Sequence, residues 1–351
     1  MPLTLGIETS CDESAAAVTD GPQRVRSSVI ATQHDLHALY AGVVPEIASR
    51  AHLQRLTPVI TEAVRQAGVS LSDIEAIAVG NRPGLIGSLL VGVSAAKALA
   101  WSLDVPLVGV HHLLAHLHAP SLDDGEIAFP AVSILASGGH TAVYHQTGPL
   151  EATLLGGTID DAVGEAFDKA ATMLEAGYPG GPAIERLAAR GNDRAVDLPI
   201  ARLGKDRLDF SFAGLKTALL YAVRGTPTGR GRQSVFPRSI ADCDADRRAD
   251  LAASFQRCAV SALVDGVERA LDRTEARSLC GGGGVLANTL LRSRLEALAQ
   301  SKDVPLRLPP MKYCVDNAAM IAGLGSLLVS SGRTDGLDLQ AIARSPVGDA
   351  A

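Results

Sequence analysis

The chain has 351 residues, which predicts two domains or two lobes that each bury a core of their own. Hydrophobic residues make up 47% of it, and this share excludes an intrinsically disordered protein. The formal net charge of −6 gives no overall attraction for nucleic acid, so any contact with nucleic acid has to be local or supplied by a partner.

The five cysteines are dispersed along the chain and none of them forms a CxxC pair. This pattern predicts reduced thiols and a cytoplasmic protein. The first residues, MPLTLGIETS, have no basic segment followed by an apolar one, so we expect no signal peptide. No apolar stretch of about 18 residues is free of breakers and charges, and we therefore expect no membrane span and no membrane partner.

The first 110 residues alternate between strand and helix patterns. LTLGIET and AAAVTD flank the turn CDES, which predicts a β-hairpin. A helix is expected over residues 45–66, and a buried strand over IEAIAVGN. The loop RPGLIGS, a helix of small residues (LLVGVSAAKALAWSL) and the short strand PLVGVH follow.

The same order of elements then restarts. AVSILAS and TAVYHQT are expected strands around the turn Gly138-Gly139. Helices are predicted over DDAVGEAFDKAATML, GPAIERLAARG and ADLAASFQRCAVSALVDGVERAL, and a strand over ARSLCGGGG. The helix-forming segment ANTLLRSRLEAL follows the glycines, and DNAAMIAGLGSLLVSSG is the last expected helix.

This weak internal repeat predicts two similar α/β lobes with a ligand-binding cleft between them. We expect an N-terminal lobe over residues 1–129, completed by the last helix at about 316–332, and a C-terminal lobe over residues 130–315. Residues 333–351 show no periodicity and are expected to form an irregular tail.

Four of the nine histidines lie between positions 111 and 118. His112 and His116 stand four residues apart, so a helix would present both on one face to a single metal ion. Taken alone, such a pair is more often partly buried packing than a metal site. Asp316 is the candidate third ligand, although its alternative role is to cap the last helix. Two imidazoles and one carboxylate leave open positions on the ion, which suits iron or zinc.

Three turns at strand ends are suited to bind a phosphate or a nucleotide. They are residues 9–14, residues 137–141 and the four glycines at 281–284. Glycine turns expose backbone N–H groups, and a following helix adds positive potential. Each turn alone is a weak signal because glycine turns are common. Together, in a two-lobed α/β chain, they indicate a nucleotide site.

Two clusters of charged residues can be explained either by a binding site or by a solvated surface. Asp161, Glu165 and Asp168 are expected on one face of a helix, where they would form a site or simply a solvated face. Four arginines without an intervening acid, Arg224, Arg230, Arg232 and Arg238, lie in a Gly/Pro/Thr-rich loop. That loop is either a local nucleic-acid contact or a solvated loop.

Nine segments, in order, resemble the motifs of the bacterial TsaD family of tRNA threonylcarbamoyladenosine biosynthesis proteins. They are GIETSCDES, ASRAHL, VHHLLAHLHAP, LASGGHT, IDDAVGEAFDKAA, YPGGP, DFSFAGLKT, CGGGGVLAN and CVDNAAMIA, and they span about residues 3 to 325. The resemblance implies the actin/hexokinase-like (ASKHA) fold, an α/β architecture of two ribonuclease-H-like lobes around a nucleotide-binding cleft.

The resemblance also implies an activity. Members transfer the threonylcarbamoyl group from threonylcarbamoyl-AMP to the N6 amine of the adenosine 3′ of the anticodon, in tRNAs that read codons beginning with A. It implies work alongside TsaB and TsaE, with TsaC supplying the adenylate. An ATPase or sugar-kinase-like enzyme of the same fold is the alternative, as is a non-catalytic paralogue. A metallopeptidase is rejected, because Leu113 stands where an HExxH motif needs Glu.

By the same resemblance, His112, His116 and Asp316 would hold one divalent metal per chain, with Fe(II) favoured and Zn(II) as the alternative. The expected adenylate-binding residues lie in several motifs: Leu135, Ala136, Ser137, Gly138, Gly139, Asp168, Gly181, Glu185 and Asn288. Asp12 and Glu13 are the candidate catalytic residues, with Asp12 as acceptor of the amine proton. The chain departs from the family at Leu114-Ala115, where relatives often carry Glu-Gly, and at Ala213, where many carry Ser.

Overall fold

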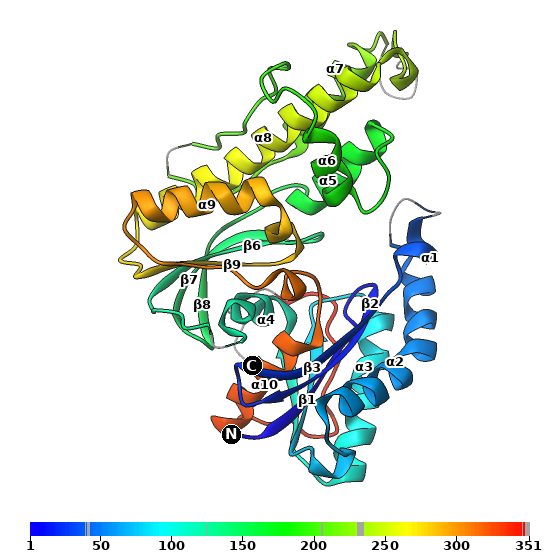
Figure 1. Ribbon diagram of the computed structural model, residues 1–351, viewed down its shortest axis with the longest axis vertical. Coiled ribbons are helices and arrows are strands. Elements are labelled where there is room, and N and C mark those ends of the chain that lie inside the picture. Colours follow the sequence, from blue (N-terminus) through cyan, green and yellow to red (C-terminus); the bar gives the residue numbers. More distant parts are fainter. Residues whose placement is uncertain are drawn as a thin grey trace.

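The computed structural model describes residues 1–38, 40, 43–123, 125–204, 206–229, 235–345 and 347, without the side chains of residues 34 and 38. Two five-stranded sheets organise two lobes (Figure 1). The predicted two-lobed α/β fold is confirmed.

The N-terminal lobe is built on the sheet β3-β2-β1-β4-β5. Its first three strands form an antiparallel meander, and β4 and β5 add to β1 in parallel. Helices α2 and α3 cover one face and α10 covers the other. The bounds are β1 (Leu3–Glu8), β2 (Glu13–Asp20), β3 (Arg24–Thr32), α1 (His34–Ala38), α2 (Pro45–Ala67), β4 (Ala76–Arg82), α3 (Ile86–Leu103), β5 (Leu107–His111) and α10 (Ala318–Ser330).

The C-terminal lobe repeats this plan with the sheet β10-β9-β6-β7-β8. Strands β6, β7 and β8 form the meander, and β9 and β10 run parallel to β6. The predicted internal repeat is therefore present in strand order as well as in element order. The bounds are β6 (Ala131–Ala136), β7 (Thr141–Gly148), β8 (Glu151–Gly157), α5 (Val163–Met173), α6 (Gly180–Ala188), α7 (Ala213–Arg224), α8 (Ala245–Leu271), β9 (Ser278–Gly282), α9 (Thr289–Ser301) and β10 (Leu306–Arg307).

The short helix α4 (His112–His118) lies between the two sheets (Figure 1). It contacts β4 and β5 on one side and β6 and β9 on the other. Gly282 makes this packing possible, because a Cβ at that position would lie only 2.1 Å from the carbonyl oxygen of His116. Leu113 and Leu117 of α4 pack with Leu135 and Tyr144 in a small apolar cluster between the lobes. The histidine pair is thus built into the junction of the two lobes.

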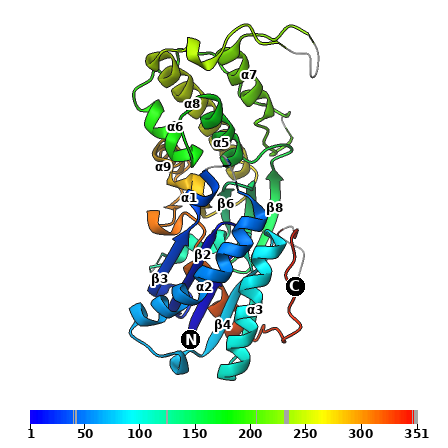
Figure 2. The same ribbon diagram turned by 90° about the vertical axis from the view of Figure 1, so that its right-hand side faces the viewer.

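The segment after α10 runs along the N-terminal lobe without regular structure (Figure 2). Asp335 pairs with Leu107 of the edge strand β5, and its carboxylate accepts a hydrogen bond from the Gly109 N–H at 2.8 Å. Further along, the Asn81 side chain donates to the carbonyl of Gln340 at 3.0 Å. The bonds of Asp335 satisfy part of the otherwise open edge of β5, and the Asn81 bond ties the segment to β4.

Helix α3 is the one helix in the described part of the chain that is long and apolar enough to cross a membrane by length and composition. It packs on β4 and on α2 as a covering helix of the N-terminal sheet. Such a helix is weak evidence for a membrane span, because core helices of other proteins pass the same test.

Candidate active site

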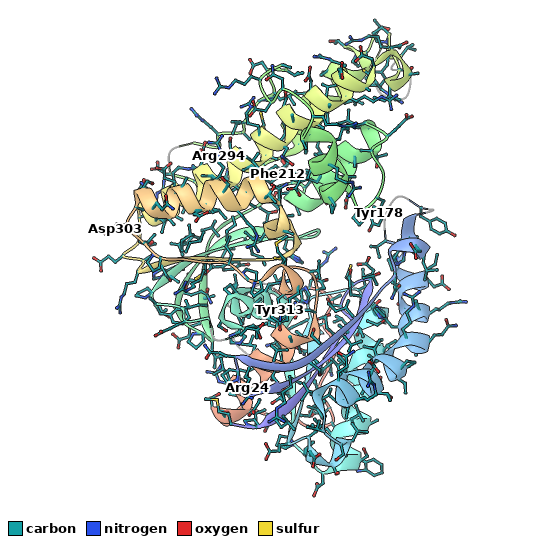
Figure 3. The ribbon with its side chains drawn as sticks, viewed as in Figure 1. Arg24, Tyr178, Phe212, Arg294, Asp303 and Tyr313 are labelled. Carbon is teal, nitrogen blue, oxygen red and sulfur yellow. The ribbon has the colours of Figure 1, made fainter. Side chains whose placement is uncertain are left out.

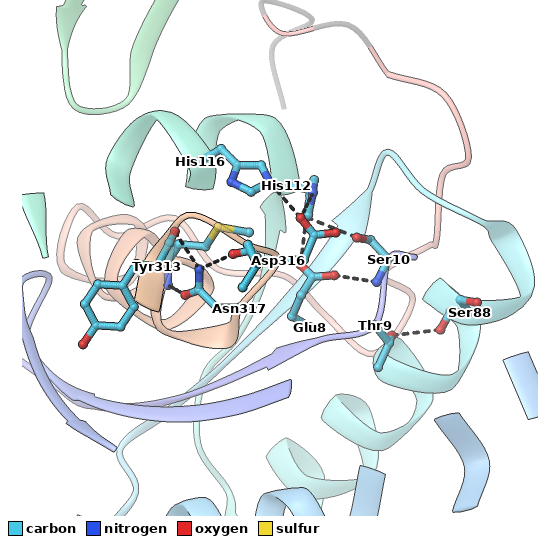
Figure 4. A network of polar contacts seen from close by, with 11 residues as sticks. Glu8, Thr9, Ser10, Ser88, His112, His116, Tyr313, Asp316 and Asn317 are labelled. Carbon is cyan, nitrogen blue, oxygen red and sulfur yellow. Dashed lines mark hydrogen bonds and ion pairs between the residues drawn. The ribbon is translucent and has the colours of Figure 1, made fainter. Parts of the chain in front are cut away.

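Three side chains at the junction of the lobes form a group that could hold a metal ion. His112 and His116 come from α4, and Asp316 comes from the segment just before α10 (Figure 4). Their ligand atoms all lie within 4.8 Å of one another. Asp316 Oδ1 is 3.0 Å from Nε2 of His116 and 3.5 Å from Nε2 of His112. The structure therefore brings together the three residues that the sequence predicted as metal ligands.

Glu8, at the end of β1, supports this group from behind. Its Oε2 accepts a hydrogen bond from Nδ1 of His112 at 3.0 Å, and its Oε1 accepts one from the Ser10 N–H at 2.5 Å (Figure 4). The carboxylate is fully buried. Gly80 on β4 makes room for it, because a Cβ there would lie 2.6 Å from Glu8 Oε2. A proton held on Nδ1 leaves Nε2 of His112 free to bind an ion, as in carboxylate–histidine–metal arrangements.

The pKa shifts of His112, His116 and Asp316 show how the charges of these side chains depend on one another. Burial disfavours the imidazolium form, but the carboxylates of Glu8 and Asp316 outweigh burial and raise the pKa of His112 well above its usual value. Burial likewise opposes an ionised Asp316, but His112 and His116 hold the pKa of this carboxyl well below its usual range. For His116 burial dominates and lowers the pKa. The carboxylates of Glu8 and Asp316 thus stabilise positive charge on His112, whereas His116 stays neutral more readily.

This donor set fits a divalent metal. The buried Glu8, His112 and His116 and the partly exposed Asp316 together carry an excess of negative charge that a divalent cation would neutralise. Both Nε2 atoms lie near Oδ1 of Asp316, so each imidazole needs a proton on Nε2 to donate a hydrogen bond to that oxygen. A bound ion would take the place of these two protons. Two nitrogens and one oxygen are ligands typical of zinc and of non-haem iron, with positions left open for substrate.

The turn between β1 and β2 brings carboxylates to the same cavity. Cys11, Asp12 and Glu13 line it. The fully buried His52 of α2 fixes this turn, since its Nε2–H donates to the Cys11 carbonyl at 3.0 Å and its Nδ1 lies 2.8 Å from the Ser14 hydroxyl. Burial lowers the pKa of His52, which matches a neutral ring with one donor and one acceptor. Both candidate catalytic residues are therefore held at the cleft.

The turn between β6 and β7 is open in contrast. Ser137, Gly138 and Gly139 line the cavity, and a Cβ at either glycine would meet no atom within 4 Å. The carbonyls of Ser137 and Gly138 accept from the first amides of α5, Gly164 at 3.2 Å and Glu165 at 3.1 Å. The turn is thus rigidly held while its surface stays free. Leu135 and Ala136 differ from the rest of this predicted set, because they are fully buried in β6 and do not line the cavity.

Of the four glycines at 281–284, three pack closely against other parts of the chain and one lines the cavity. Gly281 and Gly282 are packed against the core and α4, and Gly283 has a φ of +97° with its Cβ position 2.4 Å from the Ala136 carbonyl oxygen. Only Gly284 of the four lines the cavity in the described structure. Close packing, rather than room for a phosphate, therefore accounts for most of this glycine run.

The remaining predicted substrate residues line the cavity on the C-terminal lobe. Asp168 of α5 accepts from the Gly180 N–H at 2.8 Å, which ties α5 to the start of α6. Glu185 accepts from the Thr289 N–H at 2.8 Å, and Asn288 caps α9 by accepting from the Leu291 N–H at 3.0 Å. Gly181 has open space at its Cβ position. The structure brings these four residues together around one wall.

Both lobes line a single cavity of about 1360 Å³. His112 and Asp316 of the metal group, residues of both hairpin turns and Gly284 line it, whereas the fully buried His116 does not. The size of the cavity exceeds that of common small-molecule pockets of about 300–1,000 Å³. Tyr178, on the side of the C-terminal lobe that faces the N-terminal lobe, also lines it (Figure 3). The cavity is large enough for a nucleotide together with part of a second substrate.

Several residues of the site were missed by sequence reasoning. Glu8 and His52 lie in the quoted motifs GIETSCDES and ASRAHL but were given no role. His140, in LASGGHT, lines the cavity, and burial lowers its pKa to about 4. Burial first, with the carboxylates of Asp12 and Asp168 adding to it, raises the pKa of Tyr178. Their presence in motif segments was the available signal.

The acidic cluster is not arranged as predicted. Helix α5 begins only at Val163, so Asp161 precedes it and does not share a helix face with Glu165 and Asp168. Asp161 instead pairs with Lys216 and Lys169. The extended backbone of Ala162 at the start of α5 explains the difference.

The arginine-rich loop is described only in part, because Arg230 and Arg232 lie outside the described residues. Arg224 lies over the Phe236 ring at 5.6 Å, and the Arg238 guanidinium donates to the carbonyl of Ala222 at 3.3 Å. Both described arginines thus make local contacts. His111 and His118 lie outside the metal group, since their Nε2 atoms contact the carbonyls of Ser345 and Pro22.

Fold and site define a two-lobed enzyme of the actin/hexokinase-like architecture with a candidate metal centre in its cleft. HypF from T. kodakarensis shares this architecture, with a TM-score of 0.61 at 14% identity over 94% of this chain and 48% of that one. The chain belongs to the TsaD family, tRNA N6-adenosine threonylcarbamoyltransferases, whose family model matches residues 24–323.

Two curated relatives carry the same family description. The protein of Symbiobacterium thermophilum is 48% identical over 97% of this chain and 95% of its own length. That of Trichlorobacter lovleyi is 47% identical over 98% of this chain and 96% of its own length. The chain is a transferase by this membership.

Proposed function

We propose that this chain transfers the threonylcarbamoyl group from threonylcarbamoyl-AMP to the N6 amine of the adenosine 3′ of the anticodon, in tRNAs that read codons beginning with A. The observation that carries the proposal is the shared cavity of the two lobes. One wall bears His112 and Asp316, which share a candidate metal group with the buried His116, and another bears the open Ser137–Gly139 turn. Family membership supplies the reaction, and the cavity supplies a place for both substrates.

The adenylate is assigned to the C-terminal lobe. Backbone N–H groups of Gly138 and Gly139 are the proposed donors to its phosphate, since no side chain fills the space beside them. The Ser137 N–H donates to the His140 carbonyl at 2.8 Å and holds the turn in shape. The wall formed by Asp168, Gly181, Glu185 and Asn288 is the proposed nucleoside site. Leu135 and Ala136 contribute through the strand that positions the turn, because their side chains are buried.

The acceptor amine is a weak nucleophile, since its lone pair is delocalised into the purine ring. A divalent ion at His112, His116 and Asp316 would supply Lewis-acid polarisation of an acyl or phosphate oxygen. The Ser137–Gly139 turn would stabilise the charge that grows on the departing phosphate. Asp12 is proposed to accept the amine proton, with Glu13 as its neighbour in the same turn, because both line the cavity.

We favour Fe(II) as the native ion, with Zn(II) as the alternative. Both accept two imidazoles and one carboxylate while leaving positions open. Glu8 supports either choice, because it fixes the orientation of the His112 ring.

The proposed partners are tRNA, threonylcarbamoyl-AMP, and the TsaB and TsaE proteins, with TsaC as source of the adenylate. An exposed apolar surface on α2 and α3 is consistent with a protein partner: Leu53 is 69% exposed, Leu90 51% and Trp101 75%. A cytoplasmic location is proposed, in line with free thiols at all five cysteines.

The test is incubation of the purified chain, with its partner proteins, with threonylcarbamoyl-AMP and unmodified tRNA. Digestion of the tRNA and mass spectrometry of its nucleosides are expected to show threonylcarbamoyladenosine. A tRNA whose acceptor adenosine is replaced by guanosine is the matched control and should stay unmodified. Hydrolysis of the adenylate without any modified nucleoside would contradict the proposal.

A further inference from the structure

The cavity carries a charge that does not suit its proposed substrates. Within the described chain it is lined by six carboxylates: Asp12, Glu13, Glu165, Asp168, Glu185 and Asp316. Only two Lys or Arg side chains line it there, Lys169 and Arg344. Lys169 is engaged, since its Nζ lies 2.7 Å from Glu165 and 3.0 Å from Asp161. Two substrates with phosphate groups must nevertheless enter.

Arg344 is the cation that remains available. It is exposed, and its side chain makes no hydrogen bond or ion pair with any residue that the structure describes. Its backbone is nonetheless held on both sides. The Gly84 N–H donates to the carbonyl of Ala343 at 3.2 Å, and Nε2 of His111 lies 3.2 Å from the carbonyl of Ser345. The backbone that carries the Arg344 guanidinium is therefore held in place at the cavity.

A buried anchor follows Arg344. Val347 is 7% exposed and packs with Leu113 and Leu117 of α4 and with Leu135 and Tyr144 of the C-terminal lobe. The chain thus leaves the edge of the N-terminal sheet, runs beside α3 toward β8 (Figure 2), and packs Val347 against the helix that carries His112 and His116. We name residues 342–347, of which 346 lies outside the described residues, the C-terminal strap.

Arg344 and the proposed nucleoside wall lie on different lobes, although Val347 of the strap reaches the C-terminal lobe at Leu135, two residues before the Ser137–Gly139 turn. Arg344 lies with Gly84 on the N-terminal side of the cavity, whereas Asp168, Gly181, Glu185 and Asn288 belong to the C-terminal lobe. A guanidinium pairs well with phosphate oxygens, which it can bind in a bidentate way. Because the Gly138–Gly139 turn is already the proposed site of the adenylate phosphate, we assign a phosphate near Arg344 to the second substrate, the RNA.

We propose that Arg344 binds a backbone phosphate of the tRNA next to the acceptor adenosine. The proposal rests on the proposed function, because that function makes tRNA the second substrate. The C-terminal strap then acts as part of the RNA-binding surface. Its charge offsets part of the repulsion between the RNA and the carboxylates that line the cavity.

The test compares Arg344→Gln and Arg344→Lys with Arg333→Gln in the presence of the partner proteins. Arg333 is an exposed arginine of the same terminal segment that does not line the cavity, and it is the matched control. We expect Arg344→Gln to raise Kd and KM for tRNA by about tenfold and to lower the slope of log Kd against log salt by about 1. Arg344→Lys should recover part of the loss, and Arg333→Gln should match the wild type.

Separate measurements distinguish the two sources of phosphate. With tRNA saturating, KM for threonylcarbamoyl-AMP is expected to stay within about twofold in Arg344→Gln. An increase of that KM with unchanged tRNA binding would overturn the assignment and give the arginine to the adenylate. Equal tRNA affinity and equal salt slope in Arg344→Gln and wild type would also overturn it.

Val347→Ser tests the anchor, since it loosens the strap but keeps the charge. We expect a smaller rise in KM for tRNA, and no additional rise when it is combined with Arg344→Gln. Full additivity of the two changes would contradict a role of the anchor in placing Arg344. Failure of the proposed function is recognised separately, as a wild-type protein that binds tRNA but transfers nothing.

Discussion

The hairpin turn between β1 and β2 and the hairpin turn between β6 and β7 occupy equivalent places in two sheets of the same strand order. Their surroundings differ in kind. The first is bordered by carboxylates and fixed by His52, and Glu8 at its start reaches the metal group. The second contains two glycines, Gly138 and Gly139, with open space beside them.

The same strand order therefore supports two kinds of chemistry. Buried carboxylates suit a cation and a proton, whereas free backbone N–H groups suit an anion. Because α4 lies between the sheets, the metal group is close to both turns at once. We expect substitutions in the first turn to change proton transfer and metal binding, and substitutions in the second turn to change adenylate binding.

The largest expected effect comes from Asp12→Asn, which removes the proposed proton acceptor of the first turn. Single-turnover transfer to tRNA should fall by about 10²- to 10⁴-fold. The metal content, measured on the same preparation, should stay at the wild-type level, because Asp12 is not among the three candidate ligands. Transfer at the wild-type rate would remove Asp12 from the mechanism.

Glu8→Gln separates metal support from proton transfer within the same region. Loss of the carboxylate behind His112 should weaken metal affinity by about 10- to 100-fold, measured by competition with a chelator. Glu126→Gln removes an exposed carboxylate away from the cavity and is the control. If both variants held metal equally tightly, the role assigned to Glu8 would be wrong.

Gly138→Ala tests the second turn, and Gly283→Ala is its structural counterpart. A Cβ at Gly138 meets no atom, so we expect an unchanged free energy of unfolding but a KM for threonylcarbamoyl-AMP raised by about tenfold. Gly283 has a positive φ and a Cβ position 2.4 Å from a carbonyl oxygen. Its variant should lose about 1–3 kcal/mol of unfolding free energy. A destabilised Gly138→Ala would contradict an open turn.

The smallest effect on transfer is expected for His118→Gln, which leaves both turns intact. Burial lowers the pKa of His118 to about 4, below its usual value of 6.5. The unfolded chain therefore binds the proton first as the pH falls, and unfolding free energy decreases from about pH 6.5 to about pH 4, by about 3 kcal/mol in total. The variant should flatten this part of the stability curve, measured by denaturant unfolding. An equally steep curve would show that His118 does not contribute.

The part of the fold that could be predicted is local or repeated. The strands flanking CDES and the turn at Gly138-Gly139 have clear apolar patterns, and both hairpins are present. Strands β3, β8 and β10 and helix α7 were not predicted. The two-residue strand β10 is too short to show a pattern, and β8 is largely exposed.

The site could be predicted where residue type and spacing carry the chemistry, as for the pair His112 and His116. It could not be predicted where distant parts of the chain meet. In the sequence Glu8 is one residue of a predicted strand. Its role depends on contact with His112, which is 104 positions away and lies beside it only in the folded chain. The C-terminal strap has no periodicity, and its order comes from contacts such as that of Ser345 with His111, 234 positions away.

The central claim is that metal binding by His112, His116 and Asp316 and transfer of the threonylcarbamoyl group depend on each other. The most direct measurement is metal content and transfer on the same anaerobic preparations of wild type and His112→Ala. We expect one divalent ion per chain in the wild type, and loss of both the ion and the modified nucleoside in the variant. A His112→Ala protein that lacks metal but modifies tRNA at the wild-type rate would contradict the account.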